Sequence, residues 1–410
     1  MTRPAPDRTA RPVRPDRPVR SAGLPGGGLA RWRRRVSRMP AVVAVTAVAV
    51  GTAVFMATVP QYRDWFDVYV YYGAVDTWIR HGGGIYDYVR PGTGYGFTYP
   101  PFAAVCMLPM LVLGRTAAVM GSVVLNAAAS AVLLRRLLGG LLRGPGAWVV
   151  AGCLFVMLEP VRDTFSLGQV NLALMALVYA DRGRGRFAGV GIGLATAVKL
   201  TPGIFIGYLL LTGRRRAAAV AAGTAAAATL IGVAAAPHES WVFWTQALWN
   251  TDRVGTLDYV SNQSLQGTLA RLDAGRPAWA LAVLAVLALW GYRVRQAAAA
   301  GDDAAGLALT GLAGCLVSPV TWVHHLVWAL PAVVWLAAAG RRAAAAVLYV
   351  VLCSSVVWLW REDASGVDGF LGGSAYVWIC LGLLALWPRL PAPDRAAHLQ
   401  ATARPADRRP

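Results

Sequence analysis

The chain carries little charge and almost no lysine. Only 14% of its 410 residues are charged, whereas 57% are hydrophobic, and its mean hydropathy is +0.49. Lys199 is the single lysine, so arginine supplies nearly all of the positive charge. In an ordinary soluble domain about 25% of the residues are charged. The composition therefore excludes that class and predicts a polytopic membrane protein.

Cysteine is scarce, and no two cysteines form a C-x-x-C pair. All five lie inside apolar segments, which favours small packed side chains over disulfides or thiolate metal sites. The sequence also lacks a P-loop, a GxGxxG motif and a DxD motif in a loop setting. The acidic pair Asp302-Asp303 falls in a segment predicted to be cytoplasmic. These absences fit a donor that is not a nucleotide sugar, and we expect no cofactor.

The formal net charge of +19 raises the question of nucleic acid binding. The arginines, however, stand in short clusters between apolar runs. The tendency of positively charged loops to stay in the cytoplasm explains this pattern better than nucleic-acid binding does. Residues 1–38 are predicted to be a disordered basic arm in the cytoplasm and 391–410 a disordered cytoplasmic tail. Residues 39–390 form the membrane domain, an all-α polytopic fold of about ten to thirteen apolar helices, including short re-entrant ones.

The positions of the basic clusters decide the expected topology. Ala41–Val59 is long enough to span, and the arm before it favours a retained helix over a signal peptide. Phe102–Leu113 is short for a span, so we interpret it as a re-entrant half-helix. Phe187–Gly213 is flanked by basic clusters and broken at Lys199, which predicts a hairpin of two short helices. Polar intervals at about 61–101 and 237–276 become outer loops, and both termini are cytoplasmic.

Under this topology the polar residues that interrupt apolar segments meet at the outer face of the cytoplasmic membrane. Such convergence indicates a site, since intramembrane ionisable groups are functional by default. Lys199, at the hairpin tip, could reach the same cavity. The converging residues are Asp67, Asp76, Tyr99, Glu159, Arg162, Gln169, Asn171, Asn262, Gln263, His324 and His325.

Six blocks of the sequence, in order, resemble the actinobacterial polyprenol-phosphate-mannose-dependent α-1,2-mannosyltransferases, which belong to glycosyltransferase family 87 of the GT-C superfamily. The resemblance runs from about Val59 to Trp328. It implies a GT-C fold, an active site on the outer face and a lipid-linked mannose donor. The blocks are Asp67-x-x-Val-Tyr71, Phe97-Thr-Tyr-Pro-Pro101, Glu159-Pro-x-Arg162 with Gly168-Gln-Val-Asn171, Val198-Lys-Leu-Thr-Pro202, Ser261-Asn-Gln-Ser264, and Ser318-Pro-Val-Thr-Trp-x-His-His325.

Asp67 is the residue we expect to act as catalytic base. Sugar transfer with inversion needs one base to take the proton of the acceptor hydroxyl. It needs no second carboxylate as nucleophile, by analogy with inverting glycosidases. The family resemblance places such an acid in the first outer loop, where Asp67 stands. Asp64 and Asp76 are alternatives, and each could instead bind acceptor hydroxyls.

The departing polyprenyl phosphate gains negative charge and calls for preset donors. The candidates are Lys199, Arg162, one of His324 and His325, and Arg253. The histidine pair also raises the question of a divalent metal. Neighbouring positions diverge on a helix, so the spacing suits no zinc pattern. We therefore predict phosphate contact and no metal site.

The remaining polar residues are suited to sugar or acceptor binding. Amides at helix mouths can bind sugar hydroxyls, although helix capping or interhelical bonding is an equal alternative. The Tyr99-Pro100-Pro101 turn fixes the backbone where the chain re-enters the membrane. The residues assigned to sugar or acceptor binding are Asp76, Tyr99, Glu159, Gln169, Asn171, Asn262 and Gln263.

The expected function is inverting transfer of mannose from polyprenyl-phosphate-mannose to a glycolipid or lipoglycan, with the resemblance implying an α-1,2 linkage. One alternative keeps the enzyme and changes the sugar to arabinose or glucose. Another is a lipid or sugar transporter with a midplane site at the broken helix. The absence of an internal inverted repeat, and the gathering of polar residues at one face, favour the enzyme.

Overall fold

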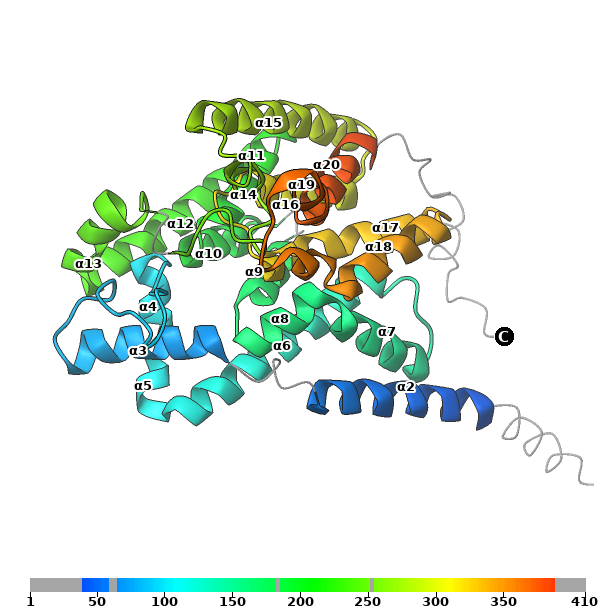
Figure 1. Ribbon diagram of the computed structural model, residues 1–410, viewed down its shortest axis with the longest axis horizontal. Helices are drawn as coiled ribbons and strands as arrows, with labels where there is room; N and C mark the ends of the chain where they lie inside the picture. Colours follow the sequence, from blue (N-terminus) through cyan, green and yellow to red (C-terminus); the bar gives the residue numbers. More distant parts are fainter. Residues whose placement is uncertain (1–38, 59–64, 182–184, 251–253, 388–410) are drawn as a thin grey trace, which may run out of the picture.

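The computed structural model describes residues 39–58, 65–181, 185–250 and 254–387, and Figure 1 shows them as a bundle of helices. Within these ranges the regular structure is helical, and β-pairing is limited to one isolated bridge between Val89 and Gly96. The all-α architecture is thus as expected. The predicted arm, 1–38, and tail, 391–410, lie outside the described residues, as do Asp64 and Arg253.

Three helices of the described residues are long and apolar enough to cross a membrane, and the number rises to five if two bent helix pairs are each one span. The bent pairs are α7–α8, with 77° between its helices, and α19–α20, with 53°. The chain is accordingly a polytopic membrane protein. The three long helices are α6 (Arg115–Leu138), α12 (Arg215–Ala235) and α15 (Arg276–Ala299).

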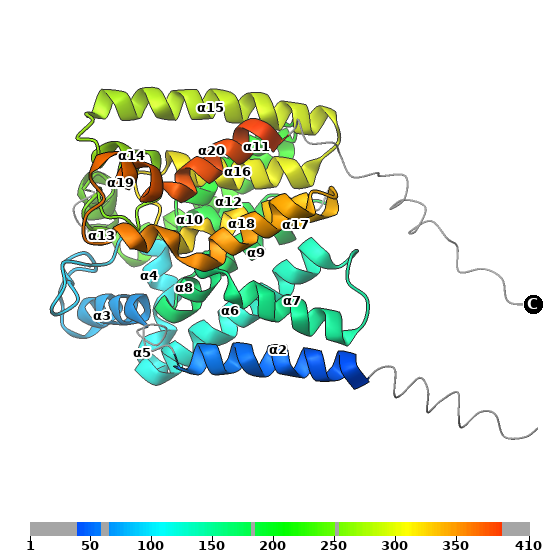
Figure 2. The ribbon, with the colours of Figure 1, turned by 45° about the vertical axis from the view of Figure 1, so that its right-hand side comes forward.

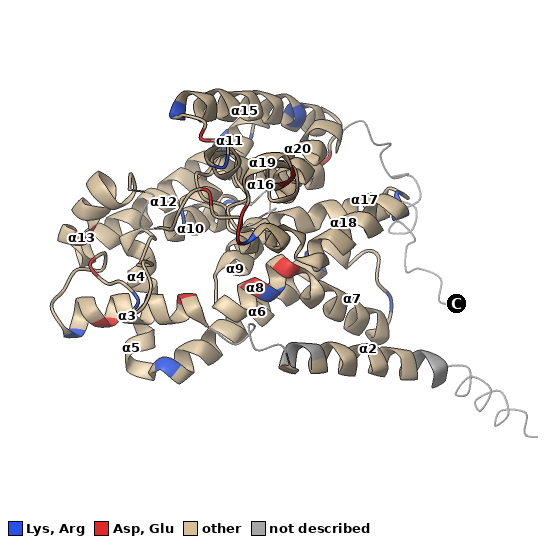
Figure 3. Cartoon of the chain, viewed as in Figure 1, with Lys and Arg blue, Asp and Glu red and all other residues tan. Residues whose placement is uncertain are grey.

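The first helix, α2 (Met39–Thr58), lies against α7 (Pro145–Met157), on the opposite side of the molecule from α15 (Figures 1 and 2). Its twenty residues rise about 30 Å, the thickness of a hydrocarbon core. Figure 3 shows the charged residues of α15 towards its two ends, which leaves an apolar middle.

The predicted polar loop at 61–101 contains a helix, α3 (Phe66–Arg80), and in that respect the prediction was wrong. The reason is its apolar periodicity: Val68, Tyr71, Tyr72 and Val75 are spaced as one helical face, and all four are buried. Six of the fifteen residues of α3 are buried. The periodicity is hard to see among so many tyrosines, whose hydroxyls make the stretch look polar.

The chain then continues through α4 (Pro101–Met107) and α5 (Pro109–Leu113), a broken pair too short to span. Pro109 stands at the break, where it removes a backbone donor. Arg80 donates to the carbonyl of Leu111 at 2.6 Å, which satisfies an end of α5 that would otherwise lack a partner. The last two side chains of α5, Val112 and Leu113, are 88% and 65% exposed, so the re-entrant half-helix stays a prediction.

The segment Phe187–Gly213 forms the predicted hairpin. Its arms are α10 (Val190–Val198) and α11 (Ile204–Leu211), joined by Lys199, Leu200 and the short turn η2 (Thr201–Gly203). A Cβ on Gly189 would lie 2.1 Å from the oxygen of Ala217, and one on Gly193 would lie 2.4 Å from that of Ala221. A step of four residues along α10 thus matches a step of four residues along α12, so the two helices run parallel. Because α11 leads directly into α12, it runs back towards the start of α12. Arg186 and the cluster Arg214–Arg216 thus lie at the same end of α12.

The remaining helices complete the wall around this hairpin. The bent pair α7–α8 continues into α9, and α13 with the π-helical turn η3 follows α12. Shorter helices and 3-10 turns connect the rest. Their bounds are α8 (Glu159–Leu167), α9 (Asn171–Ala180), α13 (Pro237–Val242), η3 (Phe243–Ala247), α14 (Leu265–Ala270), α16 (Asp303–Val317), η5 (Val323–Ala329), α17 (Leu330–Ala338), α18 (Arg342–Ser354), η6 (Val356–Trp360), α19 (Gly366–Gly372) and α20 (Ala375–Leu386).

Candidate active site

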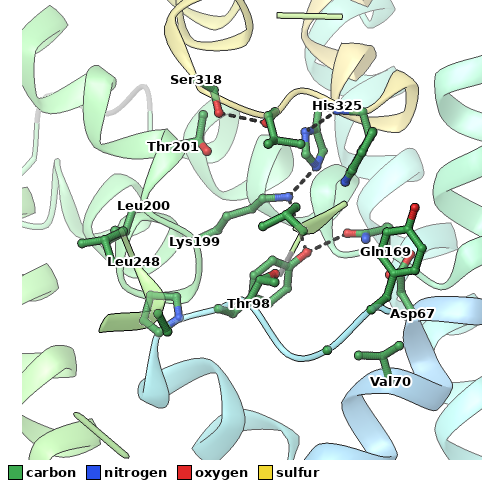
Figure 4. Close-up of a pocket in the computed structure, with 18 of the residues that line it drawn as sticks. Asp67, Val70, Thr98, Gln169, Lys199, Leu200, Thr201, Leu248, Ser318 and His325 are labelled. Atoms are coloured by element: carbon green, nitrogen blue, oxygen red, sulfur yellow. Dashed lines mark hydrogen bonds between the residues drawn. The ribbon is translucent and has the colours of Figure 1, made fainter. Parts of the chain in front are cut away.

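A cavity of about 240 Å³ lies where the hairpin tip, the start of α3, η3 and the Ser318–Trp322 turn meet (Figure 4). Asp67, Lys199 and His325, far apart in the sequence, share it. Its other polar lining comes from Tyr95, Thr98, Tyr99, Gln169, Thr201, Asn250, Ser318 and Trp322. The apolar and aromatic part of the lining includes Phe66, Val70, Leu200, Phe243, Ala247, Leu248 and Val254.

Asp67 lies in the first turn of α3, and the local backbone explains how it is aimed. Trp65 takes a left-handed conformation with φ +47°, and its N–H donates to the carbonyl of Ser166 at 2.8 Å. This bond ties the start of α3 to the end of α8. At Gly168, just beyond α8, a Cβ would lie 2.0 Å from Cγ2 of Val68. The first turn of α3 therefore packs closely against the backbone of Gly168, where the side chain of any other residue would clash with Val68.

Lys199 leaves the hairpin in an extended conformation, with φ −148° and ψ 129°, so its side chain points out of the helix axis into the cavity. Its Nζ lies 2.8 Å from Nε2 of His325, 3.1 Å from Oδ1 of Asn171 and 3.4 Å from Oη of Tyr99. These three contacts come from η5, α9 and the Tyr-Pro-Pro turn. The amine is thereby the point where these elements meet.

Tyr99 links the lysine to α3 and α8. Its hydroxyl donates to Oε1 of Gln169 at 2.7 Å and accepts from the hydroxyl of Tyr71 at 3.0 Å. Burial raises the pKa of Tyr99, and it also raises the pKa of Tyr95 nearby. Both phenols therefore stay neutral and can act as hydrogen-bond donors.

The two adjacent histidines have different surroundings. His325 lines the cavity, and its Nδ1 accepts from the backbone N–H of Trp322 at 3.1 Å. His324 is buried outside the cavity lining, and its Nε2 has no hydrogen-bond partner. Their rings meet edge to face with centroids 4.6 Å apart. Of the pair, only His325 is placed to act on Lys199.

A family model named glycosyltransferase family 87 matches residues 97–319, more than half of the chain. The chain belongs to glycosyltransferase family 87. The matched range includes Tyr99, Lys199 and Ser318 of the cavity, whereas Asp67 and His325 lie outside it. No solved structure matches the chain significantly.

Two kinds of mycobacterial relative are similar to this family 87 chain. A polyprenol-phosphate-mannose-dependent α-(1-2)-phosphatidylinositol mannoside mannosyltransferase of Mycobacterium tuberculosis is 32% identical over 356 residues, covering 78% of this chain and 83% of the relative. A polyprenol-phosphate-mannose-dependent α-(1-2)-phosphatidylinositol pentamannoside mannosyltransferase of Mycolicibacterium smegmatis is 33% identical over 318 residues, covering 74% and 76%.

Arg162, which we expected to hold the donor phosphate, does not line the cavity of this family 87 enzyme. Its guanidinium donates to the carbonyls of Met157 and Cys353 and, at 3.0 Å, to Oγ of Ser355. These acceptors lie at the ends of α7 and α18. Because guanidinium offers five donors in a fixed fork, it suits such capping, and the phosphate assignment of Arg162 is not retained.

Glu159 likewise serves the bundle. It is 1% exposed, and its carboxylate accepts from Nε1 of Trp358 at 2.6 Å and from the hydroxyl of Tyr376. It therefore joins α8 to η6 and α20. Asp76 points away from the cavity, where it pairs with Arg80 at 3.1 Å. Neither acid lines the cavity as an acceptor-binding group should.

The amides divide into two groups. Asn262 donates to the carbonyls of Leu257 and Pro319 and accepts from the N–H of Thr321, and it is fully buried. Gln263 is bonded in the same way to the backbone of Val260, Gly373 and Tyr376. Both amides therefore hold loop and turn backbone in place, and neither is free to bind sugar hydroxyls through these atoms.

Gln169 and Asn171 keep their place at the site. Gln169 lines the cavity itself, whereas Asn171 stands behind it, next to a void of about 20 Å³. Asn171 accepts from Lys199 through Oδ1 and donates to the carbonyl of His324 at 3.4 Å through Nδ2. Asn171 would therefore act on a ligand only indirectly, by holding the side chain of Lys199.

The sequence reasoning missed several lining residues. Thr201 and Ser318 each directly precede a proline, and Thr98 stands two residues before Pro100. The nearby prolines were the signal that could have pointed to these three residues. Phe243 and Ala247 could not be found this way, because they belong to the π-helical turn η3. Such turns often mark functional sites but have no simple sequence signature.

Proposed function

We propose that this chain transfers mannose from polyprenyl-phosphate-mannose to a glycolipid or lipoglycan. The observation that carries the proposal is that Asp67, at the start of α3, and Lys199, at the hairpin tip, line one cavity with a carboxylate and an amine. The named donor of the relatives is polyprenol-phosphate-mannose, and sugar transfer from it needs both a base and a group that receives phosphate charge.

Asp67 acts as the base. Retaining enzymes place two carboxyl groups about 5–5.5 Å apart, one of them as nucleophile. Among the described lining residues Asp67 is the single carboxylate, which favours direct attack by the acceptor and inversion at the anomeric carbon. The proton of the acceptor hydroxyl passes to Asp67 as the new bond forms and the bond to phosphate breaks.

Lys199 receives the departing phosphate. The donor is a phosphodiester with one negative charge, and one amine matches that charge. The hydroxyls of Thr98, Thr201 and Ser318 lie in the same lining and can donate to the remaining phosphate oxygens. A nucleotide diphosphate sugar carries more charge than this site could neutralise.

The acceptor we propose is a phosphatidylinositol mannoside or a related lipoglycan, and the linkage is α-1,2, as the names of the relatives give for theirs. Aromatic side chains suit the apolar faces of sugar rings. Phe66, Tyr95, Phe243 and Trp322 supply such faces around the cavity.

We further propose that the cavity opens outside the cytoplasmic membrane, with both termini in the cytoplasm. The basic cluster Arg214–Arg216 lies at one end of α12, and the hairpin tip with Lys199 points towards the other end. Positive clusters favour the cytoplasmic side. Single cysteines placed at 215 and 95 of a cysteine-free variant should label from opposite sides of sealed vesicles. Labelling of both from one side would contradict this orientation.

Transfer from radiolabelled polyprenyl-phosphate-mannose to a phosphatidylinositol mannoside, by the full chain in a bilayer, tests the function. Asp67→Asn should lower the transfer rate by about 10²–10⁴-fold, the usual contribution of a general base, while donor binding persists. Asp76→Asn, on the same helix but off the cavity, is the matched control. A transporter would tolerate Asp67→Asn. Faster transfer from arabinose or glucose donors would keep the enzyme and change the sugar.

A further inference from the structure

The hydrogen bonds of His325 fix where its ring carries a proton. Nδ1 accepts from the backbone N–H of Trp322, so this nitrogen must present a lone pair. In a neutral imidazole the proton then resides on Nε2. Nε2 is the atom that lies 2.8 Å from Nζ of Lys199. His325 therefore presents an N–H to the lysine.

A lysine ammonium cannot accept that N–H, since it has three donors and no lone pair. A neutral amine has two N–H groups and one lone pair. The surroundings of Lys199 match the neutral form: the lone pair accepts from His325, and the two N–H groups donate to Asn171 and Tyr99. Tyr99 in turn accepts from Lys199 and Tyr71 and donates to Gln169. Each group in the chain thereby has a complementary partner.

Other titratable groups face this pair from the neighbouring elements. They are Asp67 and Tyr71 on α3, Tyr99, Cys315 near the end of α16, and His324 on η5. The negative charge of Asp67 favours the ammonium form, whereas burial among neutral partners opposes it. The partners that hydrogen-bond to Lys199, namely Tyr99, Asn171 and His325, are all neutral groups.

We propose that Lys199 is a neutral amine in the empty site and takes one proton from solution when the sugar phosphate binds. The ammonium then forms opposite the phosphate, turns its third N–H from His325 towards the anion, and returns the proton when the polyprenyl phosphate leaves. His325 is thus a positioning residue that holds the amine uncharged, and not a phosphate ligand. That the bound anion is a sugar phosphate rests on the proposed function. That Lys199 is neutral in the empty site does not.

This arrangement avoids a buried ammonium whose hydrogen-bond partners, Tyr99, Asn171 and His325, are all uncharged, which is costly because a buried charge needs a charged or well-matched partner. The anionic donor supplies its own counter-charge on arrival. The binding of a single-charge phosphodiester would then be coupled to the uptake of about one proton, by linkage.

The single lysine makes a direct test possible. The full chain in lipid nanodiscs, labelled with [ε-¹³C]lysine and free of tag lysines, gives one lysine side-chain NMR signal. We expect it at the neutral-amine position at pH 7.5. His325→Gln should shift it to the ammonium position, because the glutamine oxygen can accept from lysine. His81→Gln, on an exposed side chain, is the control and should leave it unmoved. An ammonium signal in the empty wild-type protein overturns the proposal, whether or not any variant folds.

Calorimetry tests the coupling. Binding of polyprenyl-phosphate-mannose, measured in buffers of different ionisation enthalpy, should take up about one proton per donor. Lys199→Arg keeps a permanent charge and should bind with no uptake. Donor binding without uptake in the wild type overturns the proposal and leaves the proposed function standing. Failure of the donor to bind overturns the proposed function, and the empty-state signal still decides the protonation of Lys199.

Discussion

The hydroxyl of Tyr86 donates to the backbone carbonyl of Tyr99 at 2.8 Å, and both side chains are buried. The ring of Tyr86 also stacks on Phe243, with centroids 5.8 Å apart. One tyrosine therefore braces two walls of the cavity, the Tyr-Pro-Pro turn and η3. The N–H of the preceding Ile85 is held in turn by the buried carboxylate of Glu239 at 2.8 Å.

Tyr86→Phe should weaken this brace while keeping the stacking. The carbonyl of Tyr99 would lose a buried partner, which costs about 1–3 kcal/mol of unfolding free energy. We expect a lower midpoint of thermal unfolding and a slower transfer step. Tyr292→Phe, on an exposed side chain, is the control. A loss of transfer equal to that of Asp67→Asn would show that Tyr86 does more than brace.

Gly168→Ala should displace the start of α3. Its φ of +72° strains any other residue, and the added Cβ would meet Val68. Transfer should fall together with stability, because Val68 is the neighbour of Asp67. The double variant Gly168→Ala with Val68→Ala restores the space but leaves the backbone strain. Partial recovery of transfer in the double variant is the expected result, and no recovery would mean that the steric contact does not matter.

Glu159→Gln separates a structural role from acceptor binding. The amide keeps one acceptor oxygen and loses the other, so either Trp358 or Tyr376 loses its carboxylate partner. Charged hydrogen bonds contribute about 1.5–3 kcal/mol, and we expect a stability loss of that order. The KM for acceptor, measured below the unfolding transition, should hardly change. A raised KM in a stable variant would restore the original sequence-based assignment.

Chelation should leave transfer unchanged. In the part of the chain that the structure describes, no three His, Cys, Asp or Glu side chains gather as a metal site. His325, which lines the same cavity as Asp67, has both ring nitrogens in hydrogen bonds. We therefore predict equal rates with a chelator and with added Mg²⁺ or Mn²⁺. Recovery of a lost rate by either ion would contradict this prediction.

The sequence predicted the architecture well wherever a physical constraint acted over a whole segment. Apolar length and arginine clusters indicated a polytopic helical protein, and the basic residues on both sides of Phe187–Gly213 required a hairpin. The short Phe102–Leu113 segment forms the broken pair α4–α5, which is too short to span, and its re-entrant placement stays a prediction. The length of an apolar segment and the charges at its ends are visible in the sequence itself, so predictions based on them need no knowledge of distant contacts.

Individual side chains were harder to assign, because a polar residue at a helix end can face a cavity or a neighbouring helix. Arg162, Asn262 and Gln263 look like site residues in sequence, yet they bond to backbone carbonyls of segments far away in the chain. Nothing local distinguishes them from Gln169, which faces the cavity. The difference arises from contacts with residues as distant as Gly373, and a single sequence does not reveal them.

The hairpin also has a consequence for biogenesis. Neither α10 nor α11 is long enough to cross a bilayer, and the amine at their junction opposes partitioning into lipid. Their backbone neighbour, α12, emerges from the ribosome later. We therefore expect the two arms to enter the bilayer only together with α12. The cavity that Lys199 lines would then form late, after the helix that packs against α10 has been made.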